Sequence, residues 1–190
     1  MRKWAAFLCL PALCLAVAAA QAEPLVYTGA SGFTLTLPAD WFALIGGDEE
    51  PFDFDEELEP GDTEALFSSF DGMVSVTVLH PDDVPVEPYV VEELLSETAM
   101  EARVGRMSGY QKLLYRYDGP NRRAFVSYNL VDLEEGLAYA EYLVGFITGS
   151  DIAQYLKITV RADQPDARFS LIGEIVNNID VGGVREGAEG

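Results

Sequence analysis

The stretch GFTLTLPADW, residues 32–41, is the part of the sequence that decides the fold. From Phe33 to Leu37 apolar residues alternate with threonines, which is the period of a strand with one face in a core. Pro38 ends this strand, because proline has no N–H to give to a sheet ladder. Trp41 follows directly and supplies bulk to the edge of the core. We therefore expect a half-buried strand with Trp41 buried at its end.

A hairpin and a helix are expected next along the chain. The segments Ala65 to Phe70 and Met73 to Leu79 have the character of strands, and Asp71-Gly72 between them is a strong turn signal. Pro88 suits the first turn of a helix, which we expect to end near Gly105. The stripe of this helix that would face the core consists of Val90, Val91, Leu94, Leu95, Thr98, Ala99 and Ala102.

Four more strands and a final helix complete the pattern. Short turns rich in Gly, Asp and Pro separate the strands, so we expect an antiparallel meander. Its strands are expected over residues 110–117, 123–131, 137–148 and 153–162. The helix that starts at Gln164-Pro165-Asp166 would bury one stripe made of Phe169, Ile172, Val176 and Ile179. Because the strands are grouped between single helices, the sequence predicts an α+β fold, an antiparallel β-sheet flanked by helices.

The opening stretch resembles the start of PsbP-like domains, where glycine and phenylalanine lead into a strand that ends in Leu-Pro-x-x-Trp. The strand Tyr155 to Val160 and the helix Phe169 to Ile179 are similar to the last two elements of that family. The superfamily also includes a Ran-binding nuclear transport factor and bacterial exported proteins. The resemblance implies an α/β/α sandwich over about residues 25–181 and a mostly non-enzymatic, partner-binding role. The resemblance assigns no functional role to any residue of this chain. The acidic stretch is an insert that departs from the pattern of the family.

Residues 1–22 have the composition of a secretory signal peptide. Two basic residues precede an apolar segment, and Ala20 and Ala22 occupy the positions that a signal peptidase reads. We expect cleavage after Ala22 and a periplasmic or extracellular protein with no membrane insertion after cleavage. The alternative is a leader retained as an anchor.

The rest of the chain is expected to form one domain. Both cysteines lie in the leader, so the exported part must be stabilised by its core without disulfides. We expect a single α+β domain over residues 23–181 with an acidic loop at 46–64, and a disordered tail at 182–190. Nothing in the sequence indicates the oligomeric state.

The charge is strongly negative and unevenly distributed. The formal net charge is −20, and from Glu23 to Ala102 there are 20 acidic residues and no Lys or Arg. Such a field repels phosphate backbones and anionic headgroups, which argues against binding to nucleic acid or to a membrane surface. It favours cations or a basic protein or cell-envelope component as the partner.

The acidic stretch from Asp48 to Glu64 holds ten acids in seventeen residues and has two interpretations. It could be a solvated loop or a protein contact, or it could be an irregular calcium site. An EF-hand is excluded because Leu58 stands where the sharp turn needs glycine. We expect a loop without a preformed ion site. The candidate metal ligands of the alternative are Asp53, Asp55, Glu56, Glu57 and Glu59.

Motifs for catalysis are missing from the sequence. It has no Gly-x-Ser-x-Gly nucleophile elbow, no phosphate-binding loop and no dinucleotide fingerprint. His80 is the only histidine, and with Asp82 and Asp83 it could ligate a transition metal, although a turn histidine is the commoner interpretation. We therefore expect no cofactor, with calcium as the alternative.

The basic residues suggest a further hypothesis. Lys112 and Arg116 would lie on one face of their strand, as would Lys157 and Arg161, and they would form a basic patch if the two strands were neighbours. We favour scattered solvated charge, because periodicity alone cannot place strands beside each other. Arg122-Arg123 lies at a turn. The leading functional hypothesis is an exported, non-catalytic domain that binds a partner through its acidic first half. The alternatives are a divalent-cation module and an unrecognised hydrolase.

Overall fold

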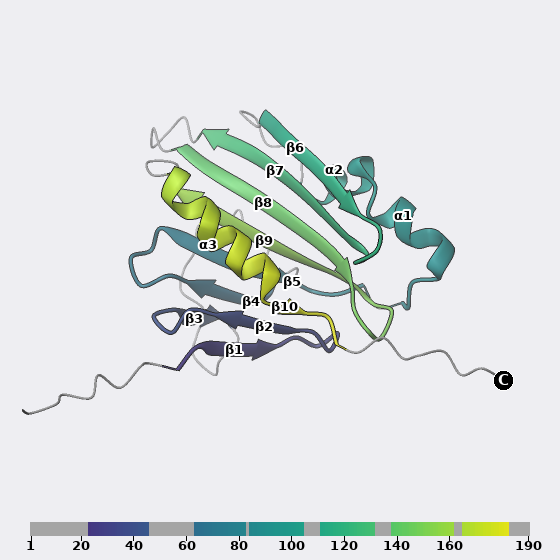
Figure 1. Ribbon diagram of the computed structural model, residues 1–190, viewed down its shortest axis with the longest axis horizontal. Helices are drawn as coiled ribbons and strands as arrows, with labels where there is room; N and C mark the ends of the chain where they lie inside the picture. Colours follow the sequence, from purple (N-terminus) through teal and green to yellow (C-terminus); the bar gives the residue numbers. More distant parts are fainter. Residues whose placement is uncertain are drawn as a thin grey trace, which may run out of the picture.

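The computed structural model (Figure 1) describes residues 23–45, 63–82, 84–104, 111–131, 138–161 and 165–182. Its centre is a seven-stranded antiparallel sheet in the order β3-β4-β5-β9-β8-β7-β6. These strands are β3 Phe42–Ile45, β4 Thr63–Ser68, β5 Val74–Leu79, β6 Gln111–Asp118, β7 Arg123–Val131, β8 Ala138–Ile147 and β9 Ala153–Arg161. The expected hairpin and the expected four-stranded meander are both confirmed.

A second, small sheet has the order β1-β2-β10 and contains the stretch that decides the fold. Its strands are β1 Leu25–Thr28, β2 Thr34–Leu37 and β10 Ile179–Asp180. Phe33, Leu35 and Leu37 are fully buried, and Trp41 is only 5% exposed. They belong to one core cluster with residues of β5, β8 and β9. The alternation and the tryptophan thus bury one face of the small sheet, as the sequence predicts.

Helices cover both faces of the large sheet (Figure 1). The helix α3 Pro165–Asn177 lies on the same face as the small sheet, and its Ile172 and Ile175 join that core cluster. A 3-10 turn at Pro88–Val90, α1 Val91–Leu94 and α2 Glu97–Val104 lie on the opposite face, where Leu95 and Met100 are fully buried. The fold is therefore α+β, an antiparallel sheet flanked by helices, as expected.

The first helical region differs from its prediction, because it is broken rather than continuous to Gly105. α1 ends before Leu95, and the Ser96 hydroxyl accepts a hydrogen bond from the N–H of Ala99 at 3.3 Å, which starts α2 as an N-cap. The break lets Leu95 and Met100 reach the core together. Thr98 and Ala102, which the helical spacing placed on the core stripe, are exposed.

The last helix is also shorter than its apolar stripe predicts. α3 ends at Asn177, and Ile179 pairs with Leu35 in the small sheet instead of continuing the helix. The buried stripe is therefore Ile172 and Ile175, with Val176 half-buried. Ile179 is buried as expected, but by strand pairing.

Several predictions lie outside the described residues. They concern the leader at 1–22, the acidic loop within 46–62 and the tail at 183–190. Among the described helices, none combines the length and apolarity needed to cross a bilayer.

Candidate functional site

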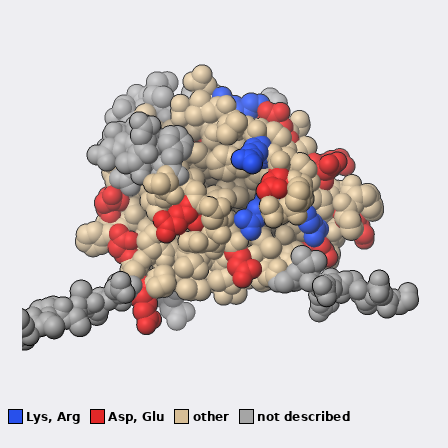
Figure 2. All heavy atoms as spheres, in the orientation of Figure 1, with Lys and Arg blue, Asp and Glu red and all other residues tan. Residues whose placement is uncertain are grey.

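The face of the large sheet that carries α3 contains a groove of about 520 Å³ between this helix and the strands β6, β7 and β8. We call it the α3 groove. Its lining includes Leu114, Arg116, Phe125, Tyr142, Ile172 and Asn177. The space-filling view of this face is hollowed near its centre, with basic side chains at the edge of the hollow (Figure 2). A volume of this size is typical of small-molecule sites.

The groove exists because α3 covers only part of its face. The helix contacts β9 and the two strands β2 and β10 of the small sheet. The outer strands β6 and β7 extend beyond the helix, which leaves part of this face of the sheet uncovered (Figure 1). On the opposite face, α2 contacts β7 and β8.

The strand register arranges the floor of the groove in three rows across β6, β7 and β8. Side chains two residues apart on a strand share a face, so each strand contributes every second residue. Cross-strand pairing then fixes which of them are neighbours. The rows are Leu114–Ser127–Tyr142, Arg116–Phe125–Val144 and Asp118–Arg123; Phe146, which pairs with Arg123 on β8, is fully buried and does not line the groove.

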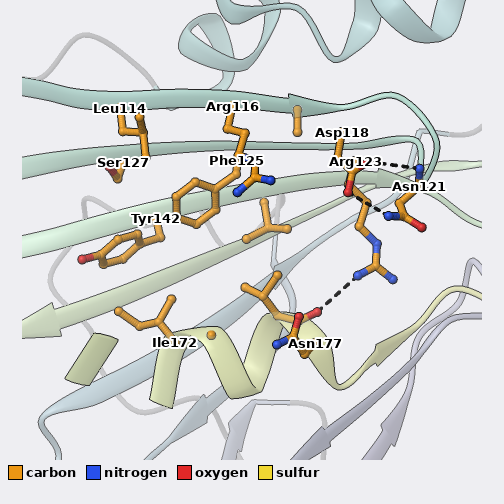
Figure 3. Close-up of a pocket in the computed structure, with 14 residues that line it drawn as sticks. Leu114, Arg116, Asp118, Asn121, Arg123, Phe125, Ser127, Tyr142, Ile172 and Asn177 are labelled. Carbon is orange, nitrogen blue, oxygen red and sulfur yellow. Dashed lines mark hydrogen bonds between the residues drawn. The ribbon is translucent and has the colours of Figure 1, made fainter. Parts of the chain in front are cut away.

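The first two rows are mainly apolar. The rings of Phe125 and Tyr142 lie 5.6 Å apart, tilted by 32°, and Ile172 of α3 faces them across the groove (Figure 3). Leu114 is 52% exposed although it is a large aliphatic residue. Burial raises the pKa of the Tyr142 phenol, so this side chain is neutral at physiological pH. The row Leu114–Ser127–Tyr142 can bury hydrocarbon without placing a charge beside it, whereas the second row carries the guanidinium of Arg116.

The third row closes the other end of the groove. The Arg123 guanidinium donates hydrogen bonds to the carbonyls of Val176 at 3.3 Å and Ile179 at 2.8 Å, and so ties the sheet to the end of α3. A cation at the C-terminus of a helix is stabilised by the helix dipole. The Nε of Arg123 is buried and has no hydrogen-bond partner among the described residues. Arg123 therefore keeps one donor unused beside the groove.

The acid in this row is engaged locally. The Asp118 carboxylate accepts a hydrogen bond at 2.8 Å from the side-chain amide of Asn121. This bond, followed by the charges of Arg116 and Arg123, holds the pKa of Asp118 below its usual range. Asp118 is thus ionised, and the end of the groove has two guanidinium groups against one carboxylate.

Arg116 stands in the middle row beside Phe125 (Figure 3). In the part of the chain that the structure describes, no carboxylate lies within 4.0 Å of its guanidinium. The chain has 32 acidic residues and only 12 basic ones, so an arginine whose guanidinium contacts no described carboxylate is unexpected. Arg116 is the cation that the groove offers to a ligand.

Gly173 lies in the interior of α3 and lines the groove. A Cβ added at this position would meet nothing within 4 Å. Neither crowding nor a left-handed backbone requires glycine here, and glycine in a helix interior is about 0.5–1 kcal/mol less favourable than alanine. The open space above Gly173 therefore comes at a cost to helix stability.

The metal ligands proposed from the sequence are not gathered in the described structure. Asp53, Asp55, Glu56, Glu57 and Glu59 lie outside the described residues, so the calcium alternative stays a prediction. His80 is exposed, and Asp82 accepts two hydrogen bonds from Arg103, at 2.8 and 3.0 Å. Among the described residues no three His, Cys, Asp or Glu side chains form a group that could hold a metal ion.

The basic patch, which was the less favoured hypothesis for Lys112, Arg116, Lys157 and Arg161, is not formed. β6 and β9 are separated by β7 and β8, so their cations are not neighbours. A β-bulge between Lys112 and Leu114 also changes the parity of β6 and turns Lys112 to the α2 face, where it contacts Glu97 and Glu101. Lys157 lies 3.8 Å from Glu141, and Arg122 pairs with Asp151 at 2.9 Å.

The α3 groove was missed at the level of the sequence. Two signals pointed to it: the alternation Leu114-x-Arg116-x-Asp118 next to a turn, and a glycine inside an apolar helical stripe. Neither signal can be interpreted before it is known which part of the sheet α3 leaves uncovered.

Comparisons with known proteins find similarity only in structure. No family model and no curated protein matches the chain. The chain is similar in structure to the cyanobacterial PsbP, CyanoP, from Synechocystis sp. PCC 6803, at 12% identity and a TM-score of 0.48 over 85% of this chain and 94% of that one. This similarity concerns the fold alone.

Two further solved structures are similar at lower scores. A protein from Bacteroides thetaiotaomicron has 15% identity and a TM-score of 0.45, with 86% of this chain and 49% of that chain covered. LpqN, involved in cell envelope biogenesis of Mycobacterium tuberculosis, has 13% identity and a TM-score of 0.38, with 83% of this chain and 87% of that one covered. At these identities no residue role is transferred to this chain.

Proposed function

We propose that the chain is an exported, non-catalytic binding domain that holds its ligand in the α3 groove. The observation that carries this proposal is the open space above Gly173, which leaves a concave, largely apolar site at a cost to the helix that borders it. Export rests on the composition of residues 1–22.

The ionisable groups of the groove support binding rather than catalysis. Its described lining contains one carboxylate, Asp118, whereas glycosidic chemistry needs two. Nucleophilic catalysis needs a base next to the nucleophile, and His80, the only histidine of the chain, does not line the groove. Asp118 is moreover kept ionised by its neighbours, which makes it a weak proton donor or acceptor near neutral pH.

A neutral solvatochromic dye, Nile red, tests the site. We expect the protein to bind the dye and Gly173→Phe to weaken this binding at least tenfold, because the new ring would fill the groove. Gly173→Ala is the matched control, since it changes the same residue and leaves most of the space open. Backbone NMR shifts should change on dye binding in β6 to β8 and α3.

Equal dye affinity in the protein and in Gly173→Phe would refute the proposal. So would shift changes located away from β6 to β8 and α3, for example at Phe70, which is 81% exposed.

A further inference from the structure

The polar end of the α3 groove specifies the charge of the ligand. The inference rests on the proposed function, because it requires that the groove is the binding site. We propose that the ligand is an amphiphile with one hydrocarbon chain and one anionic head group, a carboxylate or a phosphate, and that Arg116 binds this head group.

The position of Arg116 is the first argument. Its guanidinium is exposed, has no acidic partner within 4.0 Å among the described residues, and lies in the same row as Phe125. Guanidinium groups bind carboxylates and phosphates through paired, charge-assisted hydrogen bonds. A head group at Arg116 would therefore place the attached chain directly beside the rings of Phe125 and Tyr142.

Arg123 supplies the second argument. It lies diagonally across from Arg116 on the neighbouring strand, a separation of about 7–8 Å between such positions. One guanidinium nitrogen is used by Val176 of α3 and another by Ile179 of β10, and its buried Nε lacks a partner among the described residues. Its charge remains in the groove, so the two arginines outweigh the one carboxylate of Asp118.

The apolar end of the groove determines the chemistry of the other half of the ligand, the half without the head group. Leu114, Tyr142 and Ile172 lie at the end of the groove away from Arg123 (Figure 3). Leu114 is 52% exposed, whereas Tyr142 and Ile172 are already buried. A hydrocarbon chain placed there would mainly remove the apolar surface of Leu114 from water, and that burial is favourable in proportion to its area. A small anion without a chain would leave this surface exposed. A ligand with both parts uses the whole groove.

The global charge of the protein opposes anion binding but does not forbid it. The net charge of −20 repels an anion at a distance. At about 0.15 M salt, interactions between exposed charges are screened beyond about 8 Å. Arg116 acts at contact distance, so its attraction persists under these conditions.

Titration calorimetry with four single-chain probes below their micellar concentrations tests the proposal. They are dodecanoate, dodecyl phosphate, the neutral dodecanol and the cationic dodecyltrimethylammonium. We expect dodecanoate or dodecyl phosphate to bind at least tenfold more tightly than dodecanol, a difference of about 1.4 kcal/mol. Preference for dodecanoate would assign a fatty acid as the source of the head group, and preference for dodecyl phosphate a phospholipid-derived molecule.

Variants separate the local charge from the overall charge. Arg116→Gln should weaken the binding of the anionic probes at least tenfold and leave dodecanol unchanged. Arg161→Gln is the matched control, because it removes the same charge from β9 on the opposite face of the sheet. Asp118→Asn should strengthen the binding of the anionic probes, because it removes the only carboxylate of the described lining.

The outcomes distinguish this inference from the proposed function. If dodecanol binds as well as the anionic probes and Gly173→Phe weakens all of them, the groove is the site and the anionic head group is refuted. If no probe binds, or if Gly173→Phe changes nothing, the proposed function fails first. Equal losses in Arg116→Gln and Arg161→Gln would overturn the role of Arg116.

Discussion

Replacing Gly173 by alanine should stabilise the protein, and the reason lies in the structure of the α3 groove. The residue is inside a 13-residue helix, and an added Cβ would meet no atom within 4 Å. No steric penalty therefore offsets the higher helix propensity of alanine. We expect the free energy of unfolding to rise by about 0.5–1 kcal/mol.

Gly145 provides the matched comparison, because it is a glycine whose Cβ position is occupied. A Cβ there would lie 2.8 Å from the sulfur of Met100 and 3.0 Å from side-chain carbons of Leu95 and Tyr155. Overpacking of a core costs about 1–3 kcal/mol. The two glycine-to-alanine substitutions should therefore change stability in opposite directions.

Urea unfolding followed by circular dichroism measures both effects. A shifted midpoint with an unchanged m-value reports a change in stability alone. A destabilised Gly173→Ala variant would mean that the space above this residue is filled in the folded protein, and the reasoning for an open groove would be refuted. A stabilised Gly145→Ala variant would contradict the packing of α1 and α2 against β8.

Three further predictions follow from other parts of the chain. Trp41→Ala should lower the free energy of unfolding by about 3–5 kcal/mol, because the side chain is buried, and an unchanged urea midpoint would contradict this. The pKa of Tyr27 is raised by burial and by its hydrogen bond to the Glu64 carboxylate, so its contribution to stability is complete below a pH of about 10 and is lost as the pH rises further. The urea midpoint should fall in this alkaline range, and Tyr27→Phe should reduce the fall. Calorimetry in about 0.15 M monovalent salt should detect no tight calcium site; a micromolar site abolished by Asp53→Asn with Asp55→Asn would reverse the expectation for the acidic stretch.

Local patterns were sufficient to predict β2, the hairpin β4–β5, the meander β6–β9 and the class of the fold, but not the strands β3 and β10. The alternation from Phe33 to Leu37 and the turn at Asp71-Gly72 depend only on neighbouring residues, and the structure bears out both. Gly72 has a φ of 67°, a left-handed conformation that the turn requires and that glycine adopts without strain. Antiparallel meanders follow from short turns, so their order was also accessible.

Long-range placement could not be predicted from the same patterns. A single bulge in β6 reverses the face of Lys112 relative to Arg116, and no periodicity reveals a bulge before the pairing is known. The position of α3 over β9 rather than over β7 depends on its contacts with the small sheet at the far end of the chain. The groove is a consequence of that position, and it therefore lay beyond sequence reasoning.

The two faces of the edge strand β6 show what a helix above the sheet supplies and what the groove lacks. On one face, Lys112 contacts carboxylates from α2, at 2.5 Å to Glu97 and 2.6 Å to Glu101, and these contacts raise the pKa of the lysine. On the other face, Arg116 has no helix above it and no described carboxylate within 4.0 Å. The same strand thus presents a cation held by two carboxylates where α2 covers it, and one that contacts no described carboxylate where α3 stops short. A molecule that occupies the groove takes the place of the missing helix, so it should bring both the apolar surface and the negative charge that α2 brings to the opposite face.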